Sequence, residues 1–454
     1  MLNNLSLSGF KAWQELSIQF GKVTGLFGTN SSGKSSILQF LLLLKQTKNA
    51  TDRGLVLDFG GPNEFVNLGA YRDIIHGHDQ KEKISWIVDW SLPSPLKVSN
   101  PSGSRTDILF ETDRLSAECE IEWRKNGVVA DSLKYMFDGM EFELSPKNRG
   151  GTDFRLNARG AEQFQFVRAQ GRAWALPGPV KTHLFPDQAK TYYQNADFLS
   201  GFEVEYEAMM DRLYYLGPLR DYPKREYHWA GASPMDVGMR GERTVDAILA
   251  ATAQNIRCSL GYKKKSKSFE EMIAYWLMEL GLISEFRIER IGTDTNLYRA
   301  KVKRDRYSAE ALLTDVGFGV SQVLPALVLL YYVPEGSTVL MEQPEIHLHP
   351  SVQSSLADVI ISVAQTRNLQ VIVESHSEHL LRRFQRRVAE ETATAEDVKL
   401  YFVESYKGAA VLNDLRLNKF GEVENWPDHF FGDELGEIGA IKSASLRRKL
   451  ESRG

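Results

Sequence analysis

Short apolar runs alternate with polar stretches along most of this chain. Three runs, at 23–27, 339–341 and 369–373, have the composition of buried strands, and each ends at a glycine or an acid. Apolar residues at helical spacing follow the first run over 37–44 and separate the other two over 351–364. A strand, a helix and a second strand in this order imply a right-handed parallel crossover. We therefore expect an α/β fold built on a mainly parallel sheet.

A different pattern extends from about residue 84 to residue 171. Apolar and polar residues alternate there in short runs such as ISWIVDW and AECEIEW, which are separated by Gly, Asn and Asp. Alternation of this kind is typical of half-buried strands, so we expect an antiparallel sheet, followed by helix over 188–212. The expected parts of the chain are residues 1–80 and 213–405 as the two halves of an α/β head, residues 81–212 as an inserted β-rich and helical subdomain, and residues 406–454 as a small C-terminal extension.

Length and composition place the chain among ordinary globular proteins. It has 454 residues, of which 43% are hydrophobic and 25% charged, so two or three packed units are expected. The net charge of −4 argues against a surface that attracts nucleic acid as a whole, and any such binding would need local patches. Cys119 and Cys258 form neither a disulfide framework nor a zinc pattern, and this usage suits a reducing cytoplasm.

No secretory or membrane-spanning segment is expected. Residues 1–10 lack a basic segment followed by a long apolar run, which a signal peptide would have. The longest apolar runs, at 37–44 and 323–333, are too short to cross a bilayer. We therefore expect a cytoplasmic protein without a membrane partner.

Residues 28–35 read GTNSSGKS, which matches the phosphate-binding P-loop pattern G-x-x-x-x-G-K-S. The motif requires a strand before it and a helix after it, and both are expected here. Its glycines let the backbone N–H groups face phosphate oxygens, and the helix N-terminus adds positive potential. Lys34 is then placed to reach the β- and γ-phosphates of ATP, and Ser35 to bind Mg2+. The expected nucleotide-binding residues of this loop are Gly28, Asn30, Ser31, Ser32, Gly33, Lys34, Ser35 and Ser36.

Two later strands are expected to complete the nucleotide site. The run at 339–341 ends in Glu342, and a strand of this kind brings a carboxylate beside a P-loop to help hold Mg2+. The run at 369–373 leads to His376, and a histidine at this point can contact the γ-phosphate.

Some polar segments allow a second interpretation. The basic segments 263–267 and 382–387 are either solvated surface or contacts to DNA or a partner. The turn at 217–220 is either a surface turn or a contact to the nucleotide or a partner. A transition-metal cluster is a further alternative, because His-x-His spacing occurs in metal sites. Its members would be His347, His349, His376 and His379 with Glu342, Glu345 and Glu374.

The order of these motifs resembles that of the ABC-class P-loop ATPases. The chain has a P-loop containing Asn30, a small-residue turn that opens a helix, a strand that ends in an acid, and a strand that leads to a histidine. More narrowly, it is similar to the branch that includes RecF, SMC heads and the overcoming-lysogeny nucleases. The segments that carry the resemblance are YLGPLR at 215–220, DVGFGVSQVLP at 315–325, EQPEIHLHP at 342–350 and ESHSEHLL at 374–381.

The resemblance implies an ABC-type ATPase head that closes as a head-to-tail homodimer around two molecules of ATP. Gly319 and Ser321 would contact the γ-phosphate bound by the other subunit, Glu342 would be the Walker B acid, and His376 the switch histidine. A catalytic glutamate normally follows the Walker B acid, but here that residue is Gln343. An amide cannot accept a proton as a carboxylate can, so slow hydrolysis is expected. The expected catalytic residues are Glu342, Gln343 and His376, and the expected Mg2+ ligands are Ser35 and Glu342.

The expected biological role comes from the same resemblance. Stand-alone ATPases of this branch act as sensors or regulators beside nucleases in bacterial defence against phages or plasmids. We therefore expect an ATP-gated dimer with a protein partner such as a nuclease. The alternatives are a DNA repair or recombination ATPase that binds DNA directly, and an ATP-dependent scaffold that does not hydrolyse ATP.

Overall fold

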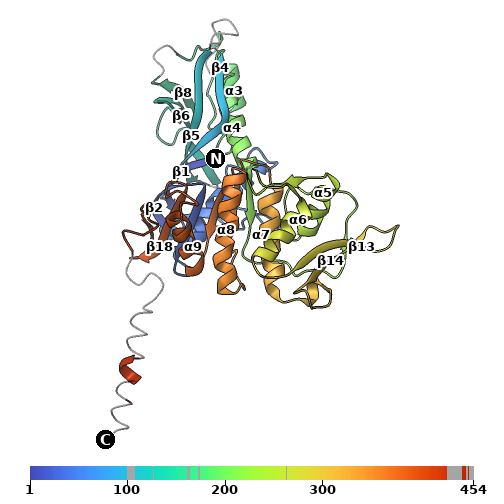
Figure 1. Ribbon diagram of the computed structural model, residues 1–454. Helices are drawn as coiled ribbons and strands as arrows, with labels where there is room; N and C mark the ends of the chain where they lie inside the picture. Colours follow the sequence, from blue (N-terminus) through green and yellow to red (C-terminus); the bar gives the residue numbers. More distant parts are fainter. Residues whose placement is uncertain are drawn as a thin grey trace.

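The computed structural model in Figure 1 describes residues 1–99, 108–125, 127–160, 164–171, 174–261, 263–426, 442–445 and 448. Much of the expected C-terminal extension, 406–454, therefore lies outside the described residues. Figure 1 shows a wide body and a narrower part that rises from it. The arm denotes the described residues between 84 and 211, and the head denotes the other described residues.

The head is organised around a six-stranded sheet with the order β19-β18-β3-β17-β16-β9. Its strands pair in parallel, except that β19 is antiparallel to β18. The sheet is buried on both faces, because Leu340 and Ile372 pack in one hydrophobic cluster whereas their neighbours Val339 and Val371 pack in another. This arrangement confirms the expected mainly parallel sheet. The strands are β3 (Val23–Gly28), β9 (Leu213–Leu216), β16 (Thr338–Glu342), β17 (Gln370–Glu374), β18 (Val398–Tyr406) and β19 (Ala409–Asp414).

Helices surround this sheet, and α8 forms the expected crossover between β16 and β17. The helices of the head are α1 (Lys34–Asn49), α2 (Tyr71–Ile74), α5 (Thr244–Ala253), α6 (Phe269–Glu279), α7 (Phe318–Tyr332), α8 (Pro350–Thr366) and α9 (Glu378–Ala389), with short 3-10 turns at His76–His78 and Leu313–Asp315. The head also has two small sheets, and three of their strands, β11, β12 and β13, contact α6. The strands are β10 (Tyr227–His228), β11 (Arg257–Cys258), β12 (Lys267–Ser268), β13 (Glu285–Arg290), β14 (Leu297–Lys303) and β15 (Ala311–Leu312).

The arm contains the expected antiparallel sheet, but this sheet extends into the head. Its order is β2-β1-β4-β5-β6-β7-β8, so the N-terminal hairpin and the arm form one seven-stranded sheet that crosses the expected boundary at residue 80. Helix α4 packs on β4. The remaining elements are β1 (Leu2–Phe10), β2 (Trp13–Gln19), β4 (Ile84–Ser99), β5 (Ile108–Arg124), β6 (Gly127–Phe137), β7 (Met140–Pro146), β8 (Phe154–Arg159), α3 (Asp187–Tyr192) and α4 (Leu199–Asp211).

A buried amide joins the two sheets. Gln370, the first residue of β17, is 2% exposed. Its Oε1 accepts hydrogen bonds from the backbone N–H of Leu2 and the hydroxyl of Thr338, both at 3.0 Å. Its Nε2 donates to the carbonyl oxygens of Leu2, at 2.7 Å, and Gly21, at 3.1 Å. This side chain therefore forms the hydrogen bonds of buried backbone groups where the seven-stranded sheet, called the arm sheet below, meets the parallel sheet of the head.

We expect Gln370→Leu to lower the free energy of unfolding by about 3 kcal/mol or more. The substitution leaves the N–H and C=O of Leu2 buried without partners, and each such loss costs about 1–3 kcal/mol. Urea denaturation at equilibrium measures the change. A suitable control is Gln365→Leu at an exposed position near the end of α8, which should cost less than about 1 kcal/mol. Equal losses in the two variants would contradict a joining role for Gln370.

Candidate functional site

The P-loop connects β3 to α1 and is held at both ends. Gly28 has a φ of 142°, and a Cβ atom there would lie 2.0 Å from the carbonyl oxygen of Val403 on β18. Only glycine therefore lets the chain leave the sheet at this point. At the other end, Nε1 of Trp13 donates a 3.1 Å hydrogen bond to the carbonyl of Gly33, and α1 begins at the next residue, Lys34.

Lys34 lies within this loop. Its side chain is buried, and Nζ donates to the carbonyl oxygens of Gly28, at 3.1 Å, and Thr29, at 2.6 Å. Burial lowers the pKa of Lys34, and the charge of Glu374 acts in the opposite direction. The ammonium group is thus placed between the loop and an acid on the neighbouring strand. Asn30 and Ser31 are exposed on the outer part of the loop.

Two acids end neighbouring strands beside the P-loop. The register of the sheet places Glu374, the last residue of β17, next to Leu26 of β3 on one side and Glu342 of β16 on the other. The hydroxyl of Ser35 donates a 2.9 Å hydrogen bond to Oε1 of Glu374. Oε1 of Glu342 instead accepts a 2.9 Å hydrogen bond from the hydroxyl of Tyr215 on β9. Of the two acids, Glu374 is therefore the one in direct contact with the expected Mg2+ ligand Ser35.

The two carboxylates repel each other in a buried setting. Burial and the charge of Glu374 raise the pKa of Glu342 to about 7, and burial raises the pKa of Glu374. A divalent cation would relieve this repulsion, because Mg2+ binds carboxylate and hydroxyl oxygens. Within the described part of the chain, no three His, Cys, Asp or Glu side chains are grouped closely enough to hold a metal by themselves. Mg2+ in nucleotide sites usually needs only one or two carboxylates, with phosphate and water as the other ligands.

The segment after β17 is held by a third acid. Glu345 is 5% exposed, and its Oε1 accepts hydrogen bonds from Oγ of Ser375, at 2.6 Å, and the backbone N–H of His376, at 3.0 Å. Partial burial and the charge of Lys34 lower the pKa of His376. The histidine therefore lies near the P-loop lysine, on a turn that Glu345 anchors.

Gln343 lies at the same edge of the sheet. It has a left-handed φ of 44°, and its backbone N–H donates a 2.8 Å hydrogen bond to the carbonyl of Glu374. A non-glycine residue in this conformation is strained, and such residues are concentrated at functional sites. The structure thus brings together the P-loop, Glu342, Gln343 and His376.

Several buried polar atoms at this edge have no hydrogen-bond partner among the described residues. They are Oγ of Ser32, Oε2 of Glu345, Oε2 of Glu374 and all three guanidinium nitrogens of Arg220. Buried polar atoms in folded proteins are nearly always hydrogen-bonded, so these atoms point to a missing ligand. The hydroxyl and guanidinium donors suit phosphate oxygens, and the carboxylate oxygens suit a cation. The residues therefore fit Mg2+ and a nucleoside triphosphate.

The position of Arg220 decides between the two interpretations of the turn at 217–220. Burial lowers the pKa of Arg220 to about 10, and the nearby Tyr215, Glu342 and Glu345 act in the opposite direction. A buried guanidinium near Glu342 is not part of a simple surface turn. From the sequence, a contact of this turn with the nucleotide or a partner was one of two interpretations. The sequence did not indicate the hydrogen bond between Ser35 and Glu374.

Gly319 and Ser321 belong to a different layer of the head. Both lie in the first turn of α7, which packs against α5, α6 and α8. Ser321 is buried and lines a small cavity with Lys224 and other residues of the segment before α5. These two residues are therefore positioned by the helical layer, whereas the P-loop and the acids are positioned by the edge of the sheet.

The arginines of α9 are engaged in ion pairs. Arg383 and Arg387 contact Asp358 on α8, and the other two arginines pair within α9 or with the residue that follows it. These contacts favour the interpretation of 382–387 as a salt-bridged surface over that of a DNA contact.

Each helix in the described ranges lacks the length or the apolar character needed to cross a membrane.

A comparison with protein families matches residues 1–141 and 246–381 to the family described as AAA ATPase domain. A second family, described as protein of unknown function (DUF3696), matches residues 394–441. A search among curated proteins gave no match.

Solved structures of SMC heads are similar to this chain at low identity. The SMC head bound to the C-winged helix domain of ScpA is 14% identical, with 92% of this chain and 98% of that chain covered and a TM-score of 0.44. The SMC head domain from Thermotoga maritima is 11% identical, with 91% and 98% covered and a TM-score of 0.40. The Smc head with an extended coiled coil, bound to the C-terminal domain of ScpA derived from Pyrococcus furiosus, is 12% identical, with 92% and 96% covered and a TM-score of 0.42.

Similarity at this level carries no conclusion about the activity or partners of the present chain. The family match, in contrast, covers more than half of the chain, including the P-loop, Glu342 and His376. These residues lie at or just after the ends of strands β3, β16 and β17 of the parallel sheet. The chain belongs to the AAA ATPase domain family, and its P-loop lies within the matched residues.

Proposed function

We propose that the head binds Mg–ATP at the edge formed by the P-loop, Glu342 and Glu374, and that it hydrolyses ATP slowly. The observation that carries this proposal is the group of unpartnered donors and acceptors around Lys34 and Ser35. Donors on the P-loop and on Arg220 match the oxygens of a triphosphate, and acceptors on the glutamates match its cation. A structural role alone leaves these buried atoms without an explanation.

We assign each residue a role in this proposed site. Lys34 supplies an ammonium group to the β- and γ-phosphates, as in other P-loop proteins. Ser35 and Glu374, which already share a hydrogen bond, hold Mg2+ with Glu342, directly or through water. Bound Mg2+ supplies positive charge that stabilises the phosphates during transfer. Arg220 adds a second fixed positive charge beside Glu342.

Slow hydrolysis follows from the residue after Glu342. Gln343 can orient a water molecule, but its amide cannot accept the proton of that water as a carboxylate can. Glu345 is the nearest alternative base. Its Oε1 is engaged by Ser375 and His376 and anchors the segment after β17, whereas its buried Oε2 has no partner among the described residues. Glu345 is therefore the rival base that the variants below test.

Two subunits closing around ATP would bring Gly319 and Ser321 to the nucleotide of the partner subunit. This proposal is supported by the resemblance to ABC-class heads and by the location of both residues in the first turn of α7. A helix N-terminus carries partial positive charge and unpaired N–H groups, which suit a phosphate.

In the cell, an ATP-gated dimer of this kind would act as a sensor or regulator with a protein partner such as a nuclease, in defence against phages or plasmids. The resemblance to stand-alone bacterial ATPases is the support for this role. The ion pairs of the α9 arginines favour a surface role for this segment over a DNA contact, and this supports the regulator over an ATPase that binds DNA directly.

Lys34→Ala should weaken ATP binding about ten- to a hundredfold, because a charge-assisted contact contributes about 1.5–3 kcal/mol. Titration with a fluorescent ATP analogue measures the affinity. Lys48→Ala serves as the matched control, since Lys48 lies in the last turn of the same helix and pairs with Asp211. Unchanged affinity in Lys34→Ala would overturn the nucleotide site.

Gln343→Glu should raise the steady-state rate of phosphate release, because a positioned general base contributes about 10²–10⁴-fold. Phosphate release by the parent, Gln343→Glu and Glu345→Gln makes the comparison. Fast turnover by the parent that is abolished in Glu345→Gln would show that Glu345 is the base and that the role given to Gln343 is wrong.

Gly317→Arg should prevent association that depends on ATP while leaving ATP binding by one subunit intact. Gly317 precedes α7, is exposed, and has no atom within 4 Å of the position of a Cβ, so arginine fits without a clash. Gly127→Arg on β6 of the arm is the control, because its Cβ position is equally open. Sedimentation with ATP and Mg2+ reports the mass. Association by Gly317→Arg equal to that of the parent would contradict a dimer interface at α7.

A further inference from the structure

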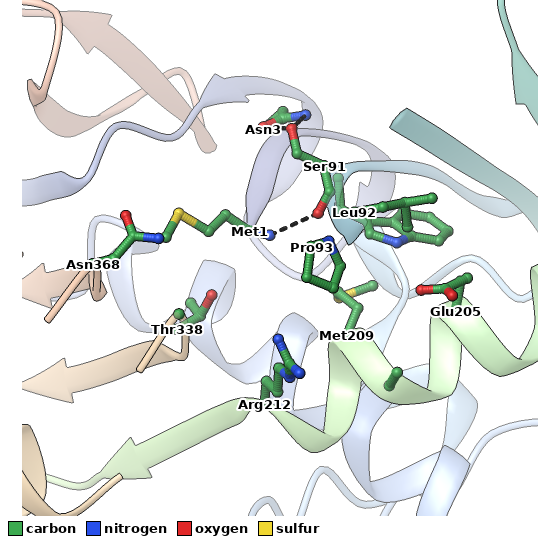
Figure 2. Close-up of a pocket in the computed structure, with 13 residues that line it drawn as sticks. Met1, Asn3, Ser91, Leu92, Pro93, Glu205, Met209, Arg212, Thr338 and Asn368 are labelled. Carbon is green, nitrogen blue, oxygen red and sulfur yellow. Dashed lines mark hydrogen bonds between the residues drawn. The ribbon is translucent and has the colours of Figure 1, made fainter. Parts of the chain in front are cut away.

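A cavity of about 370 Å³ lies where the arm joins the head, as Figure 2 shows. Arg212 and Thr338, at the beginnings of β9 and β16, line one side, and Met1, β4 and α4 form the others. The ATP site lies beyond the opposite ends of these strands, after Leu216 and Glu342. The cavity is therefore separate from the nucleotide site, and ATP binding does not account for it.

Positive charge in this cavity exceeds negative charge. Figure 2 shows Arg212 pointing from the end of α4 toward Pro93 and Met1. Among the described residues, the Arg212 guanidinium makes no hydrogen bond or ion pair. The ammonium group of Met1 donates a 2.9 Å hydrogen bond to the carbonyl of Ser91 and also lacks a carboxylate partner there. Glu205 is the single acid in the described lining; burial raises its pKa, and the charge of Arg212 acts in the opposite direction. Burial and the charge of Arg212 lower the pKa of the Met1 ammonium group. An anionic ligand would relieve the repulsion between these two positive groups.

Apolar side chains form much of the remaining lining. The Trp90 ring lines the cavity but is 1% exposed, and its unpartnered Nε1 is buried where a molecule in the cavity does not reach it. The indole therefore contributes apolar surface and no hydrogen bond to a ligand. Leu92, Pro93 and Met209 add apolar surface. The cavity thus combines apolar walls with positive charge.

We propose that this cavity is a second ligand site, which binds a small organic carboxylate with an apolar body. The carboxylate of the ligand pairs with Arg212, and the apolar body packs against Leu92, Pro93 and Met209. The volume is at the lower end of the range of about 300–1,000 Å³ that is usual for ligand pockets. The ligand touches the arm and the head together.

Isothermal titration calorimetry with octanoate and with octylammonium tests this site on the full chain. The two probes have the same apolar body and opposite charge, so they separate the charge preference from hydrophobic binding. We expect saturable binding of octanoate at one site and at least tenfold weaker binding of octylammonium. Arg212→Gln should weaken octanoate binding about tenfold or more, because it removes the charged contact while keeping a side chain of similar length. Trp90→Phe keeps an aromatic ring and should weaken binding less.

Two further variants make the result decisive. Ala208 is an exposed residue of α4 that lines the cavity, so Ala208→Phe places a ring in the cavity and should abolish octanoate binding. Arg53→Gln is the control. It removes an arginine that pairs with Asp187 on the surface, and it should leave octanoate binding unchanged. Thermal melts establish that each variant is folded. The proposal is overturned if octanoate shows no saturable binding, if octylammonium binds equally well, or if folded Ala208→Phe binds like the parent.

Discussion

Both ends of strand β17 carry a buried polar side chain, and the arrangement of the head depends on these two residues. Gln370 at the first position bonds Leu2, where the arm sheet begins. Glu374 at the last position bonds Ser35, where α1 begins. The residues between them are fully buried against both neighbouring strands, so a shift by one residue would exchange their faces. The register of this strand thus relates the arm, the P-loop and the acids to one another.

The same register concentrates charge in a buried region. Glu342 and Glu374 are adjacent on paired strands, and Glu345 lies under the turn that follows Glu374. Lys34 and Arg220 are the cations near them, and Arg220 makes no hydrogen bond in the described structure. A core that serves stability alone gains little from buried charges, whereas shifted pKa values in a buried cluster are typical of functional sites. The pKa of about 7 at Glu342 belongs to this pattern.

The sequence alone predicted the features that depend on residues close together along the chain. The P-loop, the strand that ends in Glu342 and the helix between the last two buried runs each follow from neighbouring residues. It was insufficient for features that depend on the order of strands in the sheet. The position of β17 between β3 and β16 makes Glu374, and not Glu342, the partner of Ser35. The pairing of β1 with β4 likewise joins segments that the sequence pattern separates.

Strand β9 connects the cavity at the arm with the edge of the sheet where the P-loop and the acids lie. Arg212 precedes the strand and lines the cavity at the arm, Tyr215 within it bonds Glu342, and Arg220 follows it at the phosphate end. The strand is at the edge of the sheet and pairs only with β16 in the described structure, over its whole length. An edge strand can shift with fewer hydrogen bonds broken than a central one, because it has a single neighbour. One short strand thus lies between the cavity at the arm and Glu342, with Arg212 before it and Tyr215 within it.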